Sequence, residues 1–318
     1  MLRFPILLAA AVGAILAQEP AAPKPEAAPP ASPPKKTVYT FEGKPMKLDF
    51  ACGPEDIESF GLTCSTDEPC EVYLELAAVE RVGEKLFLTG NLHTSAVTLW
   101  SILLGSEDGG KTWSEVYDRM RSAGFEQIQF IDFEIGWVGG QQLLALPRDP
   151  FFLITGDGGK TWRRRAVYGE PRVGAIQQFS FENKNNGELL IDRTQGGDSG
   201  RYEYYETNTG GDSWGLRQVT AAAPKLKHPR FHNTDWRLRA DAPSKSFQLE
   251  RRVGTRWQTV SSFLVKTGEC RPPELNLAEP PSEAEAEKTA APEASGVFVI
   301  PSEPGKAPRK KKPTLKKP

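Results

Sequence analysis

The chain has 318 residues, of which 38% are hydrophobic and 25% charged, and its formal net charge is −1. Its three histidines show no ligand spacing with its four cysteines, which argues against most metal enzymes. Only residues 37–271 have a composition that can build a core, and this length allows one sizeable domain.

The first residues have the pattern of a secretory signal. Arg3 precedes an uncharged, mostly apolar run that is too short to span a bilayer. Residues 1–17 are therefore predicted to be a signal peptide cut before Gln18, with an uncleaved anchor as the alternative. Residues 18–36 are rich in proline and alanine and are expected to form an extended linker. The mature protein is expected to be exported, either periplasmic or secreted, without a transmembrane segment.

Four cysteines in an exported chain suggest disulfide bonds. Cys52, Cys64 and Cys70 lie near the start of the foldable region, and Cys270 lies at its end. One natural scheme joins Cys64 to Cys70 and Cys52 to Cys270, which would fasten the two ends of the domain. Four cysteines allow three pairings, so the sequence favours this scheme without fixing it.

An eight-residue pattern recurs through the foldable region. It reads SEDGGKTW at 106–113, TGDGGKTW at 155–162, TNTGGDSW at 207–214 and, in degraded form, ERRVGTRW at 250–257. Internal repeats at intervals of 40–50 residues are typical of four-stranded propeller blades. The segments on both sides of each copy are rich in aromatic and branched residues, which favours strands joined by a tight Asp-Gly-Gly turn.

The predicted fold is all-β: a β-propeller of four to five four-stranded blades within residues 37–271. Each unit is read as four short strands, with the repeated pattern at the turn between the third and fourth. The segment VYTFEGKPMKLDF, residues 38–50, is expected to supply an outer or closing strand to the last blade. Such closure removes exposed sheet edges.

The repeated pattern resembles the Asp-box (BNR) repeat, S/T-x-D-x-G-x-T-W, of β-propellers such as sialidases, sortilin-like receptors and photosystem II assembly factors. The matching residues are Asp108, Gly110, Thr112, Trp113, Asp157, Gly159, Thr161, Trp162, Gly211, Trp214, Gly254 and Trp257. We interpret them as structural. A short carboxylate can accept hydrogen bonds from turn N–H groups, and glycine allows the left-handed backbone that the turn needs. No catalytic residue, metal ligand or cofactor is assigned to them.

Within this group the chain looks most like photosystem II assembly/stability factor-like propellers, which implies a non-enzymatic scaffold that binds a protein, and a glycan is a second possible ligand. The alternative is a carbohydrate-active propeller, sialidase-like or another glycoside hydrolase. The early Arg-Ile-Pro signature of sialidases is missing, and no acidic residues are marked as a catalytic pair.

Two surfaces are candidate contacts for a partner. A basic binding patch is predicted from Arg163, Arg165, Arg237, Arg239, Arg251 and Arg252. The segment LPRDPFF, residues 146–152, is predicted to be an exposed contact loop. Residues 272–318 form an acidic and then basic tail that is expected to be disordered, and its basic end could touch an anionic surface.

Overall fold

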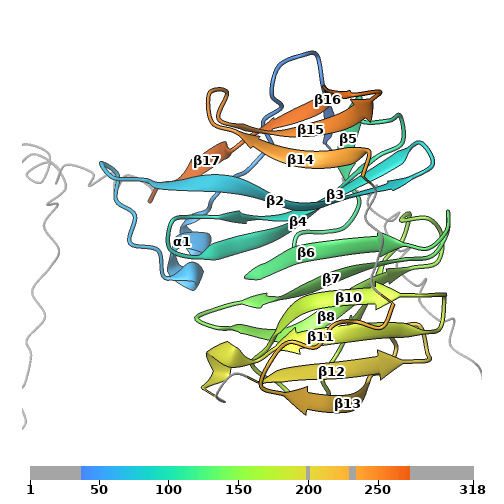
Figure 1. Cartoon of the computed structure of the whole chain (residues 1–318). Coiled ribbons are helices and arrows are strands. Elements are labelled where there is room, and N and C mark those ends of the chain that lie inside the picture. Colours follow the sequence, from blue (N-terminus) through green and yellow to red (C-terminus); the bar gives the residue numbers. More distant parts are fainter. Residues whose placement is uncertain (1–36, 198–200, 229–233, 273–318) are drawn as a thin grey trace, which may run out of the picture.

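The computed structural model describes residues 37–197, 201–228 and 234–272 of the chain. These residues form four antiparallel sheets, numbered I to IV in chain order, that are arranged one beside the next like the blades of a propeller (Figure 1). The all-β class and the repeated sheets are as predicted, with four sheets at the lower end of the predicted range. The predicted signal peptide, the linker and residues 273–318 of the tail lie outside the described residues.

Sheet I has the strand order β1-β5-β4-β3-β2-β17 and sheet IV the order β14-β15-β16; sheets II and III run β6 to β9 and β10 to β13 in order. The strands of sheet I are β1 (Val38–Thr40), β2 (Cys70–Val82), β3 (Lys85–His93), β4 (Thr98–Ser106), β5 (Thr112–Glu115) and β17 (Lys266–Cys270). Sheet II comprises β6 (Ala123–Phe130), β7 (Gly136–Leu143), β8 (Pro147–Thr155) and β9 (Arg163–Ala166).

Sheet III comprises β10 (Ala175–Phe181), β11 (Gly187–Asp192), β12 (Tyr202–Thr207) and β13 (Gly215–Thr220). Sheet IV comprises β14 (Trp236–Asp241), β15 (Ser246–Val253) and β16 (Arg256–Leu264). Helix α1 (Pro54–Phe60) and the short 3₁₀ helix η1 (Thr194–Gly196) complete the described elements. Neither α1 nor any other helix in this part of the chain is long and apolar enough to cross a membrane.

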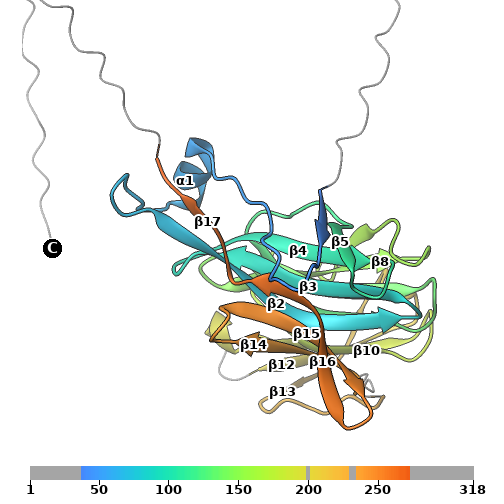
Figure 2. The ribbon, with the colours of Figure 1, turned by 90° about the horizontal axis from the view of Figure 1, so that it is seen from above.

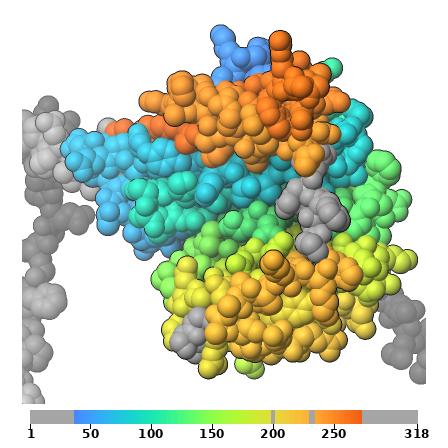
Figure 3. Space-filling view, viewed as in Figure 1, coloured from blue at the N-terminus to red at the C-terminus, as the bar shows by residue number. Residues whose placement is uncertain are grey.

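Apolar clusters between the sheets hold the row together. One cluster joins sheet IV to sheet I, with Trp113 packed against Phe263. A second joins sheets I and II, and a third joins sheets II and III, where Trp137 stacks on Phe181 at 3.7 Å. Sheet IV (orange) and sheet III (yellow) consequently lie at opposite ends of the row in the ribbon and the space-filling views (Figures 1 and 3). Sheet III packs on sheet II through one face, and its other face points away from sheet II.

The first and last strands of the described chain, β1 and β17, lie at the opposite edges of sheet I and are separate in the view from above (Figure 2). Strand β1 pairs with β5 in the first sheet, so the prediction that this segment serves the last sheet is wrong for β1. A few residues further on, Met46 forms a β-bridge to Phe263 in β16 of sheet IV. This part of the segment therefore lies at the outer edge of the last sheet, as predicted. Disulfides join Cys52 to Cys270 and Cys64 to Cys70, which is the pairing that the sequence favoured.

The two DGGKTW turns, residues 108–113 and 157–162, have the same internal hydrogen bonds. In the first, the Asp108 carboxylate accepts from Lys111 N–H, Thr112 N–H and the hydroxyls of Ser106 and Thr112 at 2.7–3.0 Å. In the second, Asp157 accepts from the equivalent groups at 2.6–3.0 Å. Gly110 and Gly159 adopt φ of 98° and 82°, which favours glycine. Each carboxylate is thus used inside its own hairpin.

The third and fourth copies of the pattern differ from these turns. In the third, Thr209 stands in place of the aspartate, and its hydroxyl accepts from Ser213 N–H at 3.0 Å. The fourth lies between β15 and β16, where Gly254 and Thr255 form a two-residue turn. Glu250 there pairs with Arg237 and Arg239 rather than with its own turn. The tryptophan of this copy, Trp257, lies under the Arg237 guanidinium at 4.1 Å. The fourth copy therefore forms a hairpin of another kind.

We expect Asp157→Ala to lower the free energy of unfolding by about 1–2 kcal/mol at neutral pH, because several N–H and O–H donors lose their acceptor. The hydrogen bond from the Thr161 hydroxyl is the main cause that lowers the pKa of Asp157 to about 2, from a usual 3.8. This stabilisation is present above the unfolded pKa and is lost as the pH falls through the folded one. Urea unfolding at a series of pH values should show the difference between wild type and variant shrinking between about pH 4 and pH 2. A difference that stays constant over this range would contradict the assignment.

Candidate functional site

The six arginines that were predicted as one basic patch divide between two sheets. Arg163 and Arg165 lie on β9 of sheet II, and both form ion pairs with Asp212 of sheet III. Arg237 and Arg239 lie on β14 of sheet IV, and both pair with Glu250. The structure therefore brings these four arginines together in two pairs, each pair on one acidic residue of the same chain.

The remaining two arginines lie on β15. The Arg251 guanidinium lies 5.8 Å from the ring centre of Trp236, and Arg252 donates to the Gly254 carbonyl at 3.2 Å. The predicted contact loop at 146–152 is instead largely strand β8, in which Phe151 and Phe152 are fully buried. The prediction of an exposed loop there is wrong, because the prolines stand at the start of the strand and at an irregularity in its pairing with β7.

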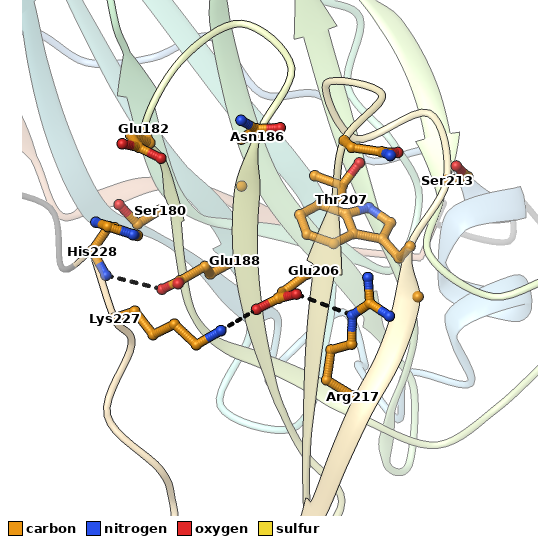
Figure 4. A pocket seen from close by; sticks show the side chains of 14 residues that line it. Ser180, Glu182, Asn186, Glu188, Glu206, Thr207, Ser213, Arg217, Lys227 and His228 are labelled. Carbon is orange, nitrogen blue, oxygen red and sulfur yellow. Dashed lines mark hydrogen bonds and ion pairs between the residues drawn. The ribbon is translucent and has the colours of Figure 1, made fainter.

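A polar cleft of about 500 Å³ lies on the face of sheet III that points away from sheet II (Figure 4). It is lined by residues of β10 to β13 and of the segment that follows β13. Its charged side chains are Glu182, Glu188, Glu206, Arg217 and Lys227. Trp214 and His228 also line it. From the sequence, Trp214 was predicted only as a structural residue of the repeat, and none of these residues was predicted to bind a partner.

Strand alternation places the cleft residues on one face. Glu188 on β11 stands opposite Glu206 on β12, and two positions along the same strands Leu190 stands opposite Tyr204. Residues of β11 and β12 between these positions, such as Leu189 and Tyr205, point to the other face and pack in the cluster with sheet II. The outer face therefore carries one pair of carboxylates next to one apolar pair.

The segment after β13, residues 224–228, crosses this face, and we call it the strap. Its Leu226 is only 5% exposed and clusters with Leu190 and Tyr204. The Lys227 ammonium forms an ion pair with Glu206 and lies 5.6 Å from the centre of the Tyr204 ring. The strap is thus held by one buried leucine and one lysine, both on the face of sheet III.

Backbone groups of the strap also take part. The His228 N–H donates to the Glu188 carboxylate at 3.1 Å (Figure 4). Arg217 of β13 donates to Glu206 at 3.0 Å from the other side, and Tyr204 donates to the same carboxylate at 3.3 Å. Each of the two paired carboxylates is consequently engaged by donors from this chain.

The basic side chains of the cleft both engage Glu206. The hydrogen bond from Lys227 is the main cause that lowers the pKa of Glu206, and Arg217 acts in the same direction. Burial, followed by the Glu188 and Glu206 carboxylates, raises the pKa of Tyr204, so its hydroxyl stays protonated as a donor. A carboxyl group with a lowered pKa is ionised at neutral pH, which suits recognition of a cation better than general-acid catalysis.

A second hollow, of about 410 Å³, follows the inner edges of the sheets. It is lined by Ala77–Val79 of β2, Glu126 of β6, Phe179 of β10 and Trp236 of β14. Burial, with a contribution from the Glu75 carboxylate, raises the pKa of Glu126. Within the described ranges no group of three or more His, Cys, Asp or Glu side chains could hold a metal ion.

No protein-family model and no curated protein matches the chain. Solved structures that it resembles include YCF48 bound to a D1 peptide, at 16% identity over 60% of this chain and 55% of that chain, with a TM-score of 0.33. YCF48 from Cyanidioschyzon merolae matches at 18% identity, over 60% and 57%, with a TM-score of 0.32. The α-L-arabinofuranosidase Arb93A from Fusarium graminearum with an iminosugar inhibitor matches at 13% identity, over 71% and 66%, with a TM-score of 0.34. The chain spans less than two thirds of either YCF48 chain, and identities this low assign it to no family.

Proposed function

We propose that the protein is a non-catalytic, exported scaffold that binds an extended segment of a partner protein across the outer face of sheet III. The observation that carries this proposal is the strap. Its short extended segment already uses the face as a ligand would, with Leu226 buried beside Tyr204 and Lys227 on Glu206. An apolar anchor beside a charge pair is the usual basis of peptide recognition on a rigid sheet.

The edge of sheet III supports the same use. Strand β13 is the outermost strand of its sheet, and five of its six residues are exposed, including Leu216 and Val219. The corresponding edge strand of sheet I, β5, is paired with β1, and β16 of sheet IV is bridged by Met46. An exposed edge with apolar side chains is a template for an added strand.

The proposed location rests on the disulfides and the charged termini. Two disulfides join all four cysteines, and such bonds persist in oxidising compartments. We place the protein in the periplasm or outside the cell, where the N-terminal signal would direct it. Its basic C-terminal end remains a proposed contact with an anionic surface.

Binding of a labelled peptide Pro-Lys-Leu-Lys-His-Pro to the full chain tests this function. Because the chain's own strap occupies the face, we expect the double variant Leu226→Ser, Lys227→Ala to bind the peptide about tenfold more tightly than wild type in fluorescence anisotropy. Adding Tyr204→Ala to that variant removes the apolar contact and should reverse the gain. Equal affinity for wild type and both variants would refute the face as a binding surface.

The second candidate function is a carbohydrate-active enzyme, and one observation favours it. Glu126 in the inner hollow has a raised pKa, while the nearby Glu75 is exposed and accepts from Asn91 at 3.1 Å. Two carboxyl groups in different environments can divide the acid and base roles of a glycosidase, and Trp236 could stack on a sugar. Release of reducing sugar from a panel of glycosides that disappears in Glu126→Gln would establish this function instead.

A further inference from the structure

The strap has a second version in the same chain. The strap and the proline that follows it in the sequence read Pro-Lys-Leu-Lys-His-Pro, and the last six residues of the chain read Pro-Thr-Leu-Lys-Lys-Pro. Four of the six positions are identical, and they include the leucine and the lysine that hold the strap to sheet III. In this alignment Leu315 takes the place of Leu226, and Lys316 takes the place of Lys227.

We infer that the C-terminal hexapeptide, residues 313–318, binds the outer face of sheet III of the same chain in exchange with the strap. The inference rests on the proposed function, because it uses the same face, and it names the kind of segment that the face accepts. Leu315 would enter the site between Leu190 and Tyr204, and Lys316 would pair with Glu206.

The charges of the face fit this occupant. Glu182, Glu188 and Glu206 line the cleft, and of the basic side chains there Lys227 belongs to the strap itself. The strap carries two lysines, Lys225 and Lys227, and the hexapeptide also carries two, Lys316 and Lys317. The exchange therefore keeps the number of lysines on this acidic face. It places Lys317 at the position of His228, whose N–H donates to the Glu188 carboxylate.

The tail is long enough to reach the face. Pro313 lies 41 positions beyond Pro272, the last described residue, and a chain of that length spans up to about 130 Å when extended. A domain of this size has a radius of gyration of about 18 Å. A segment tethered in this way reaches an effective concentration on the order of millimolar, so even weak binding within the chain is populated.

Photo-crosslinking in the full chain tests the inference. We expect Thr314→p-benzoylphenylalanine, a position where the two hexapeptides differ, to crosslink to peptides of β11 and β12. Leu315→Ser with Lys316→Glu should reduce this yield about tenfold, because the buried side chain and the ion pair are both lost. Leu226→Ser with Lys227→Ala should raise it, because the strap then competes less. The same crosslinker at Ala307, outside the hexapeptide, is the matched control.

Three outcomes would overturn the inference. The crosslinking yield from position 314 to β11 and β12 could equal the yield from position 307. It could be unchanged by Leu315→Ser with Lys316→Glu. It could also rise in proportion to protein concentration, which would mean that the hexapeptide binds a second copy of the protein. Crosslinks from position 314 could be absent while the labelled peptide Pro-Lys-Leu-Lys-His-Pro still binds the variant Leu226→Ser, Lys227→Ala. That result would refute only this inference, and the proposed function would stand.

Discussion

Replacing both Cys52 and Cys270 by serine is expected to lower the free energy of unfolding by about 5 kcal/mol, which corresponds to a fall in melting temperature of about 10–20 °C. The bond closes a loop with a sequence separation of 218, and in the chain-entropy account the stabilisation grows with loop length. It joins the segment before α1 to β17, which pairs with β2 in the first sheet. Loss of this bond releases the segment before α1 and strand β17 from each other.

The second disulfide supplies a matched control. Cys64 and Cys70 are separated by only 6 positions, so replacing both by serine should cost about 2 kcal/mol. Urea unfolding of the two double variants under oxidising conditions compares them directly. Similar losses in the two variants would show that the long loop does not contribute through its length.

Replacing Glu203 by alanine should destabilise the protein by about 3 kcal/mol, because it removes a buried carboxylate that engages two arginines and two tyrosine hydroxyls. The side chain of Glu203 is 2% exposed and forms ion pairs with Arg172 and Arg193. It also accepts from the hydroxyls of Tyr205 at 2.7 Å and Tyr168 at 3.2 Å. These contacts lie on the face of sheet III that packs against sheet II.

Glu206 on the same strand is the control. It also forms ion pairs with two basic side chains, Arg217 and Lys227, but its side chain is 28% exposed on the outer face. Glu206→Ala should therefore cost less than about 1 kcal/mol. Equal losses for the two variants in urea unfolding would contradict the division of sheet III into a core face and an open face.

Local patterns in the sequence were sufficient to predict most of the strands. The alternation around the DGGKTW turns predicted β4 with β5 and β8 with β9, since a hairpin depends on neighbouring residues. Strand β17 was not predicted, because its pairing with β2 joins segments almost two hundred residues apart. The segment at 146–152 was predicted as a loop because proline ordinarily ends strands, whereas here it stands at an irregular position.

The candidate site was not predictable in the same way. The partner of Arg163 and Arg165, Asp212, comes from the next sheet, and no local spacing indicates this. The cleft depends on the strap folding back over β11 and β12, which is also a non-local contact. The available signal was a carboxylate next to apolar or aromatic residues in each strand: Glu188 precedes Leu189–Ile191, and Glu206 follows Tyr204 and Tyr205.

A charge-swap cycle tests most directly whether the outer face of sheet III is a binding surface. The protein would be the variant Leu226→Ser, Lys227→Ala, with and without Glu206→Lys. Each form would be titrated with the labelled peptide Pro-Lys-Leu-Lys-His-Pro. Each would also be titrated with a peptide in which glutamate replaces the lysine that matches Lys227. Circular dichroism and melting temperature would first establish that Glu206→Lys remains folded. We predict that either single change weakens binding and that the two together restore it, with a coupling energy on the order of 1 kcal/mol. Affinities that change additively, with no recovery in the swapped pair, would contradict recognition of a basic extended segment at Glu206.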